Sequence, residues 1–150
     1  MTRHFADESQ HARWWTDCLS ALGADALKLN DAYQDQYLEA AGMPVNVMEI
    51  LAVTLVFERR VVGQYAAHRR VPALALPISE TLARIMEDER WHIRWVSGAL
   101  EALGPQYGAD HIAETVGRYG EADRAVYQRT LAEHQFRLDE IALKPKGVSP

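Results

Sequence analysis

The chain has 150 residues, of which 48% are hydrophobic and 25% are charged, and this composition is typical of one soluble globular domain over residues 1–150. Its formal net charge of −5 excludes a basic nucleic-acid-binding surface, and its single cysteine, Cys18, excludes an internal disulfide and a cysteine-rich metal site. The first residues contain no apolar leader, and no apolar run is long enough to cross a bilayer. We therefore expect a cytoplasmic protein with neither a nucleic-acid nor a membrane partner.

Apolar residues recur with helical spacing along the chain, and most prolines fall where this spacing breaks. In chain order, the pattern predicts a helix over 3–22, a shorter helix over 25–41, and long helices over 45–69, 78–103 and 109–140. Gly23 and Gly104 are typical C-terminal helix stops. No segment alternates with a period of two, so we expect no sheet. Four long amphipathic helices predict an all-α four-helix bundle, with an additional short helix in the 24–44 connection.

The helices predicted over 3–22 and 78–103 share a sequence repeat. The stretch "DESQHARW" begins at Asp7 and "DERWHIRW" begins at Asp88, and nine of the seventeen positions in 7–23 and 88–104 are identical. Each copy contains the motif ExxH, as Glu8 with His11 and as Glu89 with His92. On a helix, residues three apart lie on one face, so each motif can offer an oxygen and a nitrogen to the same metal ion.

Each long helix places one carboxylate on its apolar stripe when its residues are plotted at 100° per residue. These carboxylates are Glu8, Glu58, Glu89 and Asp123. The only basic groups on the same stripes are histidines, because Arg13 and Arg94 project away from them. Converging buried carboxylates without cations repel one another, and two divalent cations would remove this cost. Carboxylate and imidazole ligands suit iron and manganese.

These residues resemble the ferritin-like superfamily of di-iron carboxylate proteins, in which two helices each supply a Glu and two others each supply an ExxH motif. Glu8-Ser-Gln-His11 and Glu89-Arg-Trp-His92 match the ExxH elements, and "FERRVVGQY", with Glu58, matches a single-Glu helix. The resemblance implies a ferritin-like bundle that holds two iron ions per chain, or manganese in one or both positions. The metal ligands it implies are Glu8, His11, Glu58, Glu89, His92 and, as a substitute ligand, Asp123.

This chain departs from the family order of Glu, ExxH, Glu, ExxH, because its first helix already carries ExxH and the usual first Glu helix is absent. Three sources could replace the missing ligand: Asp123 from the last helix, His4 one turn before Glu8, or a helix of another subunit. The long 24–44 connection fits the family's crossover between its second and third helices. The short 104–108 link predicts that the last helix runs antiparallel to the helix before it.

Four residues are candidates for hydrogen bonds that orient the ligands: Tyr65, Tyr119, Tyr127 and His4. Asp7 and Asp88 either orient the imidazole of a neighbouring helix or are solvated. For the tyrosines, plain packing is an equally good explanation.

The resemblance implies an oxidoreductase that activates O2 and oxidises a small organic substrate or Fe(II). Two alternatives remain at this point: iron binding or storage without an organic substrate, and a structural bundle with a degenerate metal site. Catalytic residues other than the ligands are unknown. Glu8 follows only a few residues of its helix, whereas Glu89 follows about eleven, so a neighbouring groove is poorly covered. Because exposed apolar patches usually mark interfaces, we predict a homodimer.

Overall fold

The computed structural model describes residues 2–26 and 33–143. Its regular elements are all helices, so the all-α prediction is confirmed for this part of the chain. They are α1 (Thr2–Ala21), α2 (Tyr33–Ala41), α3 (Val47–His68), α4 (Leu76–Ala102), α5 (Gly104–Tyr107) and α6 (Ala109–Leu143). Four predicted helices match α1, α3, α4 and α6 to within a few residues. Of the helix expected over 25–41, α2 covers 33–41, residues 25 and 26 are not helical, and 27–32 lie outside the described residues. None of the helices searched has the length and apolarity needed to cross a membrane.

Local signals in the sequence account for several helix ends. The side chain of Asn46 caps α3 by accepting a hydrogen bond from the Glu49 amide at 3.0 Å. Pro77 lies in the first turn of α4, where its missing amide proton costs nothing. Gly23 follows α1 with φ of +64°, a conformation that L side chains rarely adopt, so this predicted stop is confirmed.

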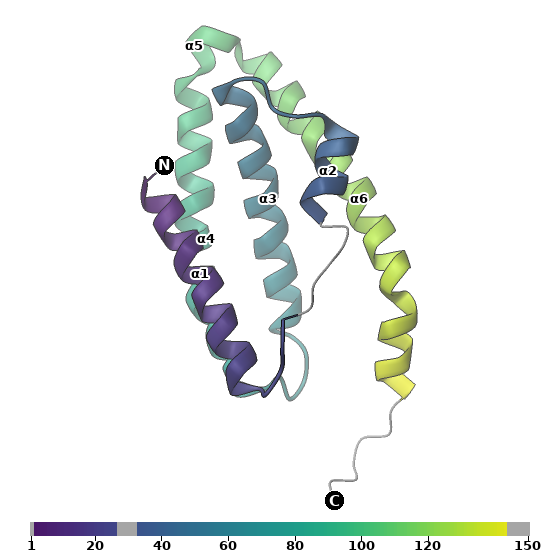
Figure 1. The fold of residues 1–150 in the computed structure, drawn as a ribbon. Helices are drawn as coiled ribbons and strands as arrows, with labels where there is room; N and C mark the ends of the chain where they lie inside the picture. The colour runs from purple at the N-terminus through teal and green to yellow at the C-terminus, as the bar shows by residue number, and fades with distance from the viewer. Residues whose placement is uncertain (1, 27–32, 144–150) are drawn as a thin grey trace, which may run out of the picture.

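The second predicted stop is only partly right. Helix α4 ends at Ala102, but Gly104 begins the short helix α5 instead of turning the chain. The turn with positive φ comes at Gly108, with φ of +85°, and α6 begins directly after it. Figure 1 shows that α6 then runs back antiparallel to α4, as the short link predicts.

The helices pack as a bundle in which α3 lies between α4 and α6 (Figure 1). Helix α1 packs along α4, and α2 packs on α6. Helix α1 ends at one end of the bundle and α3 begins at the other, so the two helices run in the same direction. The segment between them therefore crosses the length of the bundle.

Two apolar clusters hold this arrangement. One joins α3 to α4 through Met48, Leu51, Leu55, Val96 and Leu100. The other joins α2, α3 and α6 through Tyr37, Ala52, Val56 and Tyr119. Burial of such side chains stabilises a fold by roughly 1.5–3 kcal/mol for each large one. The two clusters fix the α3–α4 and α3–α6 contacts that position the polar centre described next.

Candidate metal centre

Polar side chains from three helices meet inside the bundle. Helix α1 supplies Glu8 and His11, α3 supplies Glu58, and α4 supplies Glu89 and His92. All but Glu8 are buried, and His92 is completely inaccessible to solvent. Each of the four buried residues lies on the apolar stripe of its helix, so the same periodicity that builds the core also directs these groups inward.

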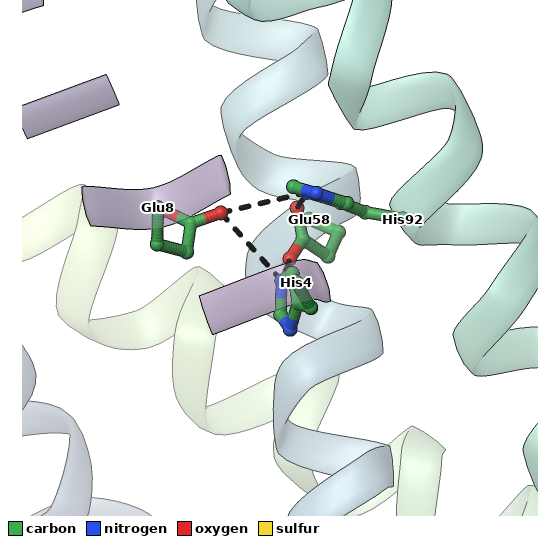
Figure 2. A group of neighbouring side chains, drawn as sticks. All are labelled: His4, Glu8, Glu58 and His92. Atoms are coloured by element: carbon green, nitrogen blue, oxygen red, sulfur yellow. Dashed lines mark hydrogen bonds and ion pairs between the residues drawn. The ribbon is translucent and has the colours of Figure 1, made fainter. Parts of the chain in front are cut away.

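Two groups of potential ligand atoms occur among the described residues, and within each group the atoms lie within 4.8 Å of one another. One consists of His4, Glu8, Glu58 and His92, drawn in Figure 2. The other consists of Glu8, His11 and Glu89. Glu8 belongs to both groups, so its carboxylate lies between two positions.

The two histidines of the repeat turn the same nitrogen toward the carboxylates. His92 Nδ1 lies 3.0 Å from Glu89 Oε2 and 3.4 Å from Glu8 Oε1. His11 Nδ1 lies 3.5 Å from Glu89 Oε1 and 3.6 Å from Glu8 Oε1. Both ExxH motifs therefore point an oxygen and a nitrogen at one central volume.

The other ring nitrogen of each histidine contacts an aspartate of the opposite helix. His92 Nε2 lies 3.2 Å from Asp7 Oδ2, and His11 Nε2 lies 3.1 Å from Asp88 Oδ2. When the ring is neutral, an Nε2–H that donates a hydrogen bond to the aspartate leaves Nδ1 with its lone pair directed at the carboxylate cluster. Of the two interpretations of Asp7 and Asp88, the structure supports the one in which each orients a neighbouring imidazole.

Crowding of carboxylates changes the protonation of the centre. Burial, together with a hydrogen bond to Glu58 and the nearby negative charges, raises the pKa of Glu89 to about 8. Burial also raises the pKa of Glu58. Burial of the His11 ring acts to lower its pKa, but hydrogen bonds with Glu8 and Asp88 outweigh this and raise it to about 9. In the metal-free protein, protons bound to Glu89 and His11 therefore offset the negative charge of the carboxylates at this centre.

This donor set fits divalent iron or manganese. The central donors are carboxylate oxygens and imidazole nitrogens, which these ions accept. The histidines have their second nitrogens held by carboxylates, as ligating histidines generally do. Burial is the main cause of the raised pKa of Glu89, and the neighbouring Glu58 and Glu8 raise it further, so a cation at this centre would favour the charged form of the carboxylate.

The structure does not bring Asp123 into this centre. Asp123 is buried, as its place on the helix predicts, but its Oδ2 accepts hydrogen bonds from the Arg60 guanidinium, with Nε at 2.9 Å. Its Oδ1 accepts a hydrogen bond from the Tyr33 hydroxyl at 2.6 Å. Asp123 is therefore paired with a cation from α3, although Arg60 itself lies off the inward stripe.

The Arg60–Asp123 pair could not be predicted from the helical pattern for a physical reason. Arg60 lies two residues after Glu58, so on a helix it projects about 200° away from the inward stripe. That direction faces α6, which α3 contacts on its second side. A helical wheel that assumes one inward face cannot reveal this second neighbour.

The three tyrosine candidates lie in different surroundings. The Tyr65 hydroxyl accepts a hydrogen bond from Trp15 Nε1 at 3.2 Å. Burial and the charges of Glu89 and Glu8 raise the pKa of Tyr65, so this tyrosine interacts electrostatically with the centre. Tyr119 donates to Glu49 at 3.0 Å within an apolar cluster. Tyr127 packs under the Arg60 guanidinium, 4.2 Å from the ring centroid. No contact between a ligand and Tyr119 or Tyr127 occurs among the interactions described.

His4, one of the three candidates for the missing ligand, does reach the centre. Its Nε2 lies 2.6 Å from Glu58 Oε1 and 3.5 Å from Glu8 Oε1 (Figure 2). The one-turn spacing of His4 and Glu8 on α1 is the sequence signal that places both on the same face.

A cavity of about 590 Å³ adjoins the centre. His4, Glu8, Glu58 and Glu89 line one part of it. Its other walls come from α2, α3 and α6 and include Tyr33, Phe57 and Tyr127, so the cavity has polar and aromatic sides. The centre is therefore accessible to a molecule larger than water.

Comparison of the chain with protein-family models, with curated protein sequences and with solved structures gives no match.

Proposed function

We propose that this protein is a ferritin-like non-haem di-iron, or iron–manganese, oxidoreductase that activates O2. Glu8, His11, Glu58, Glu89 and His92 would hold two metal ions per chain. The observation that carries this proposal is the crossed arrangement in which Asp7 and Asp88 each fix the histidine of the other ExxH motif. A solvated charge cluster has no need of such orientation, whereas metal-ligating histidines do.

The order of donors along the chain supports the ferritin-like assignment. Helices α1, α3 and α4 carry ExxH, Glu and ExxH, which corresponds to the second, third and fourth helices of the family pattern. The segment between α1 and α3 crosses the bundle, as the family's connection between its second and third helices does. Helix α6 then packs on the outer side of α3 and supplies no donor to the described clusters.

Bound iron would supply the redox chemistry with O2, and the protein would supply orientation and access. The buried side chains of Glu58, Glu89 and His92 provide a site with little solvent, in which charges interact strongly. Glu8 is more exposed, with 49% of its side-chain surface accessible, and it also lines the cavity. Its carboxylate is thus the donor with most freedom to shift when a molecule enters.

The cavity favours a small organic substrate over iron storage. A volume of about 590 Å³ lies in the range of small-molecule sites, roughly 300–1,000 Å³. Phe57 and Tyr127 offer aromatic surface for an organic molecule, whereas iron ions in transit need only carboxylates and water. The substrate class that fits is a small, largely apolar compound.

Metal analysis under anaerobic conditions tests this proposal. The full chain, purified without oxygen and loaded with Fe(II) at neutral pH, should retain about two iron ions per chain. Exposure to air should then consume O2 and change the near-ultraviolet and visible absorption. The variant His92→Ala should lose both responses. Binding of only trace metal under every loading condition would overturn the proposal, and uptake of many iron ions per chain would indicate storage.

A further inference from the structure

The centre contains one histidine that does not belong to the ExxH repeat. His4 lies 2.6 Å from Glu58 Oε1 through its Nε2 atom, and its ring meets the His92 ring nearly edge-on, with the centroids 4.3 Å apart. Only 18% of its side-chain surface is accessible. A second imidazole therefore stands beside His92 on the same carboxylates.

The repeat is broken at this position. His4 and Glu8 are four residues apart on α1, and the residue four before Glu89 on α4 is Ile85. Ile85 is 1% exposed and belongs to the apolar interior. Where α1 offers a nitrogen, α4 therefore offers only hydrocarbon, so two motifs that match closely elsewhere produce unequal surroundings.

The donors divide unequally as a result. One position is surrounded by four donor groups, His4, Glu8, Glu58 and His92, and the other by three, Glu8, His11 and Glu89. Two nitrogens and two oxygens can complete a four-coordinate site, whereas a site with three protein donors keeps a coordination position for an added ligand. Additional imidazole also strengthens the binding of later first-row metals such as Co²⁺ and Zn²⁺.

We propose that His4 is a metal ligand, which makes the position formed with Glu8, Glu58 and His92 fill first and leaves the His11 position open to an exogenous ligand. This inference rests on the proposed dinuclear centre. It gives the two positions separate roles. The first holds its ion firmly, and the second keeps a coordination position for an exchangeable ligand. Donors of both positions line the cavity, with His4, Glu8 and Glu58 from the first and Glu8 and Glu89 from the second.

Anaerobic titration of the metal-free full chain with Co(II) tests the order of filling, with visible absorption and calorimetry as readouts. The wild type should bind two ions in two resolved steps. His4→Ala should weaken the first step by more than about 100-fold, because a direct ligand matters more than the outer partners that cost 10–100-fold. His11→Ala should remove the second step and keep the first.

Two further variants separate ligation from packing. His4→Ile places on α1 the residue that α4 has at the equivalent position, and it should bring the two affinities close together while the helix content measured by circular dichroism stays unchanged. Phe5→Ala, at the neighbouring residue with 76% exposure, should leave both steps as in the wild type.

The number of bound imidazoles gives a readout that does not depend on affinity. With one equivalent of Cu(II), pulsed electron paramagnetic resonance should detect two imidazole ligands in the wild type and one in His4→Ala. Two-ion binding with unchanged affinities in His4→Ala, or one imidazole in both proteins, would overturn the inference and leave the dinuclear centre standing. Failure of the wild type to bind two Co(II) ions would overturn both.

Discussion

At the scale of single residues, the aspartates that precede the ExxH motifs connect the two copies. Asp7 on α1 contacts His92 on α4, and Asp88 on α4 contacts His11 on α1. Because each aspartate is adjacent in sequence to a glutamate of the centre, one helix turn contains both a proposed ligand and the aspartate that orients the histidine of the other helix. The two motifs therefore depend on each other, and neither is complete alone.

Removal of one supporting aspartate should weaken one metal position. We expect Asp88→Ala to lower metal affinity at the His11 position by about 10–100-fold while the stoichiometry stays near two, since the ring loses its orientation but remains present. Isothermal titration with Co(II) measures this. Asp17→Ala is the matched control on α1, because Asp17 is 69% exposed and faces Arg13. Equal losses in both variants would contradict an orienting role for Asp88.

The raised pKa values of Glu89 and His11 predict a dependence on pH. In the metal-free protein, both groups hold protons more tightly than in an unfolded chain, so their contribution to stability is present at low pH and is lost as pH rises through about 8 for Glu89 and about 9 for His11. Metal ions must displace these protons. The increase in melting temperature on metal loading should therefore grow from pH 6 to pH 9. Calorimetry at pH 7 in buffers of different ionisation enthalpy should show proton release, and no release would contradict the assignment.

At the scale of helices, the Arg60–Asp123 pair joins α3 to α6. It accounts for the burial of the Asp123 carboxylate, which is not among the donors of the described clusters. Both Asp123 oxygens have partners, and the Arg60 guanidinium also covers the Tyr127 ring. Asp123 thus has partners outside the described clusters, although its position on the helical wheel is the same as that of the proposed ligands.

Asp123→Ala should therefore reduce stability without changing the metal content. Asp123 is buried while 21% of the Arg60 side-chain surface is accessible, so the loss of their charged hydrogen bonds should lower the free energy of unfolding by about 2 kcal/mol. Urea denaturation of the metal-free protein measures this. Glu121→Ala, at an exposed position two residues away, should have little effect. A fall in metal content of Asp123→Ala would show instead that Asp123 is a ligand in solution.

The difference between Glu58 and Asp123 shows which features of the centre can be predicted from the sequence and which cannot. Helical periodicity correctly predicts which carboxylates are buried, because the direction of a side chain around its own helix depends only on residue number. The identity of the facing helix depends on how the helices are arranged, and α3 has neighbours on two sides. The motifs of α1 and α4 could be predicted to lie together because they have the same sequence pattern. Asp123 has no such partner motif, and nothing in the sequence showed that α6 lies on the other side of α3.

At the scale of the whole molecule, an apolar stretch remains exposed where the chain enters α3. Met43, Val45, Val47 and Ile50 are 67%, 81%, 45% and 40% exposed, respectively. Exposed apolar residues that cluster in this way are typical of interfaces. This stretch gives the predicted homodimer a specific candidate surface.

We expect the wild type to be a dimer at micromolar concentration and Ile50→Lys to shift it toward the monomer, because a charge at a buried interface costs free energy unless it is paired. Light scattering coupled to size exclusion measures both. Leu76→Lys is a suitable control, since Leu76 is also exposed, at 67%, but lies at the start of α4. A monodisperse wild-type monomer would contradict the prediction.

The donors of the centre lie far apart in the sequence, from residue 4 to residue 92, and this spacing has a consequence for assembly. The chain must close a loop of more than 80 residues before the first and last donors meet, and this closure has an entropic cost. Metal ions at the proposed centre would bind the closed form and not the open one, so they would shift the equilibrium toward it by mass action. A metal-loaded centre would thus hold α1 on the rest of the bundle, and the rate at which a chelator removes the ions should report how often that helix detaches.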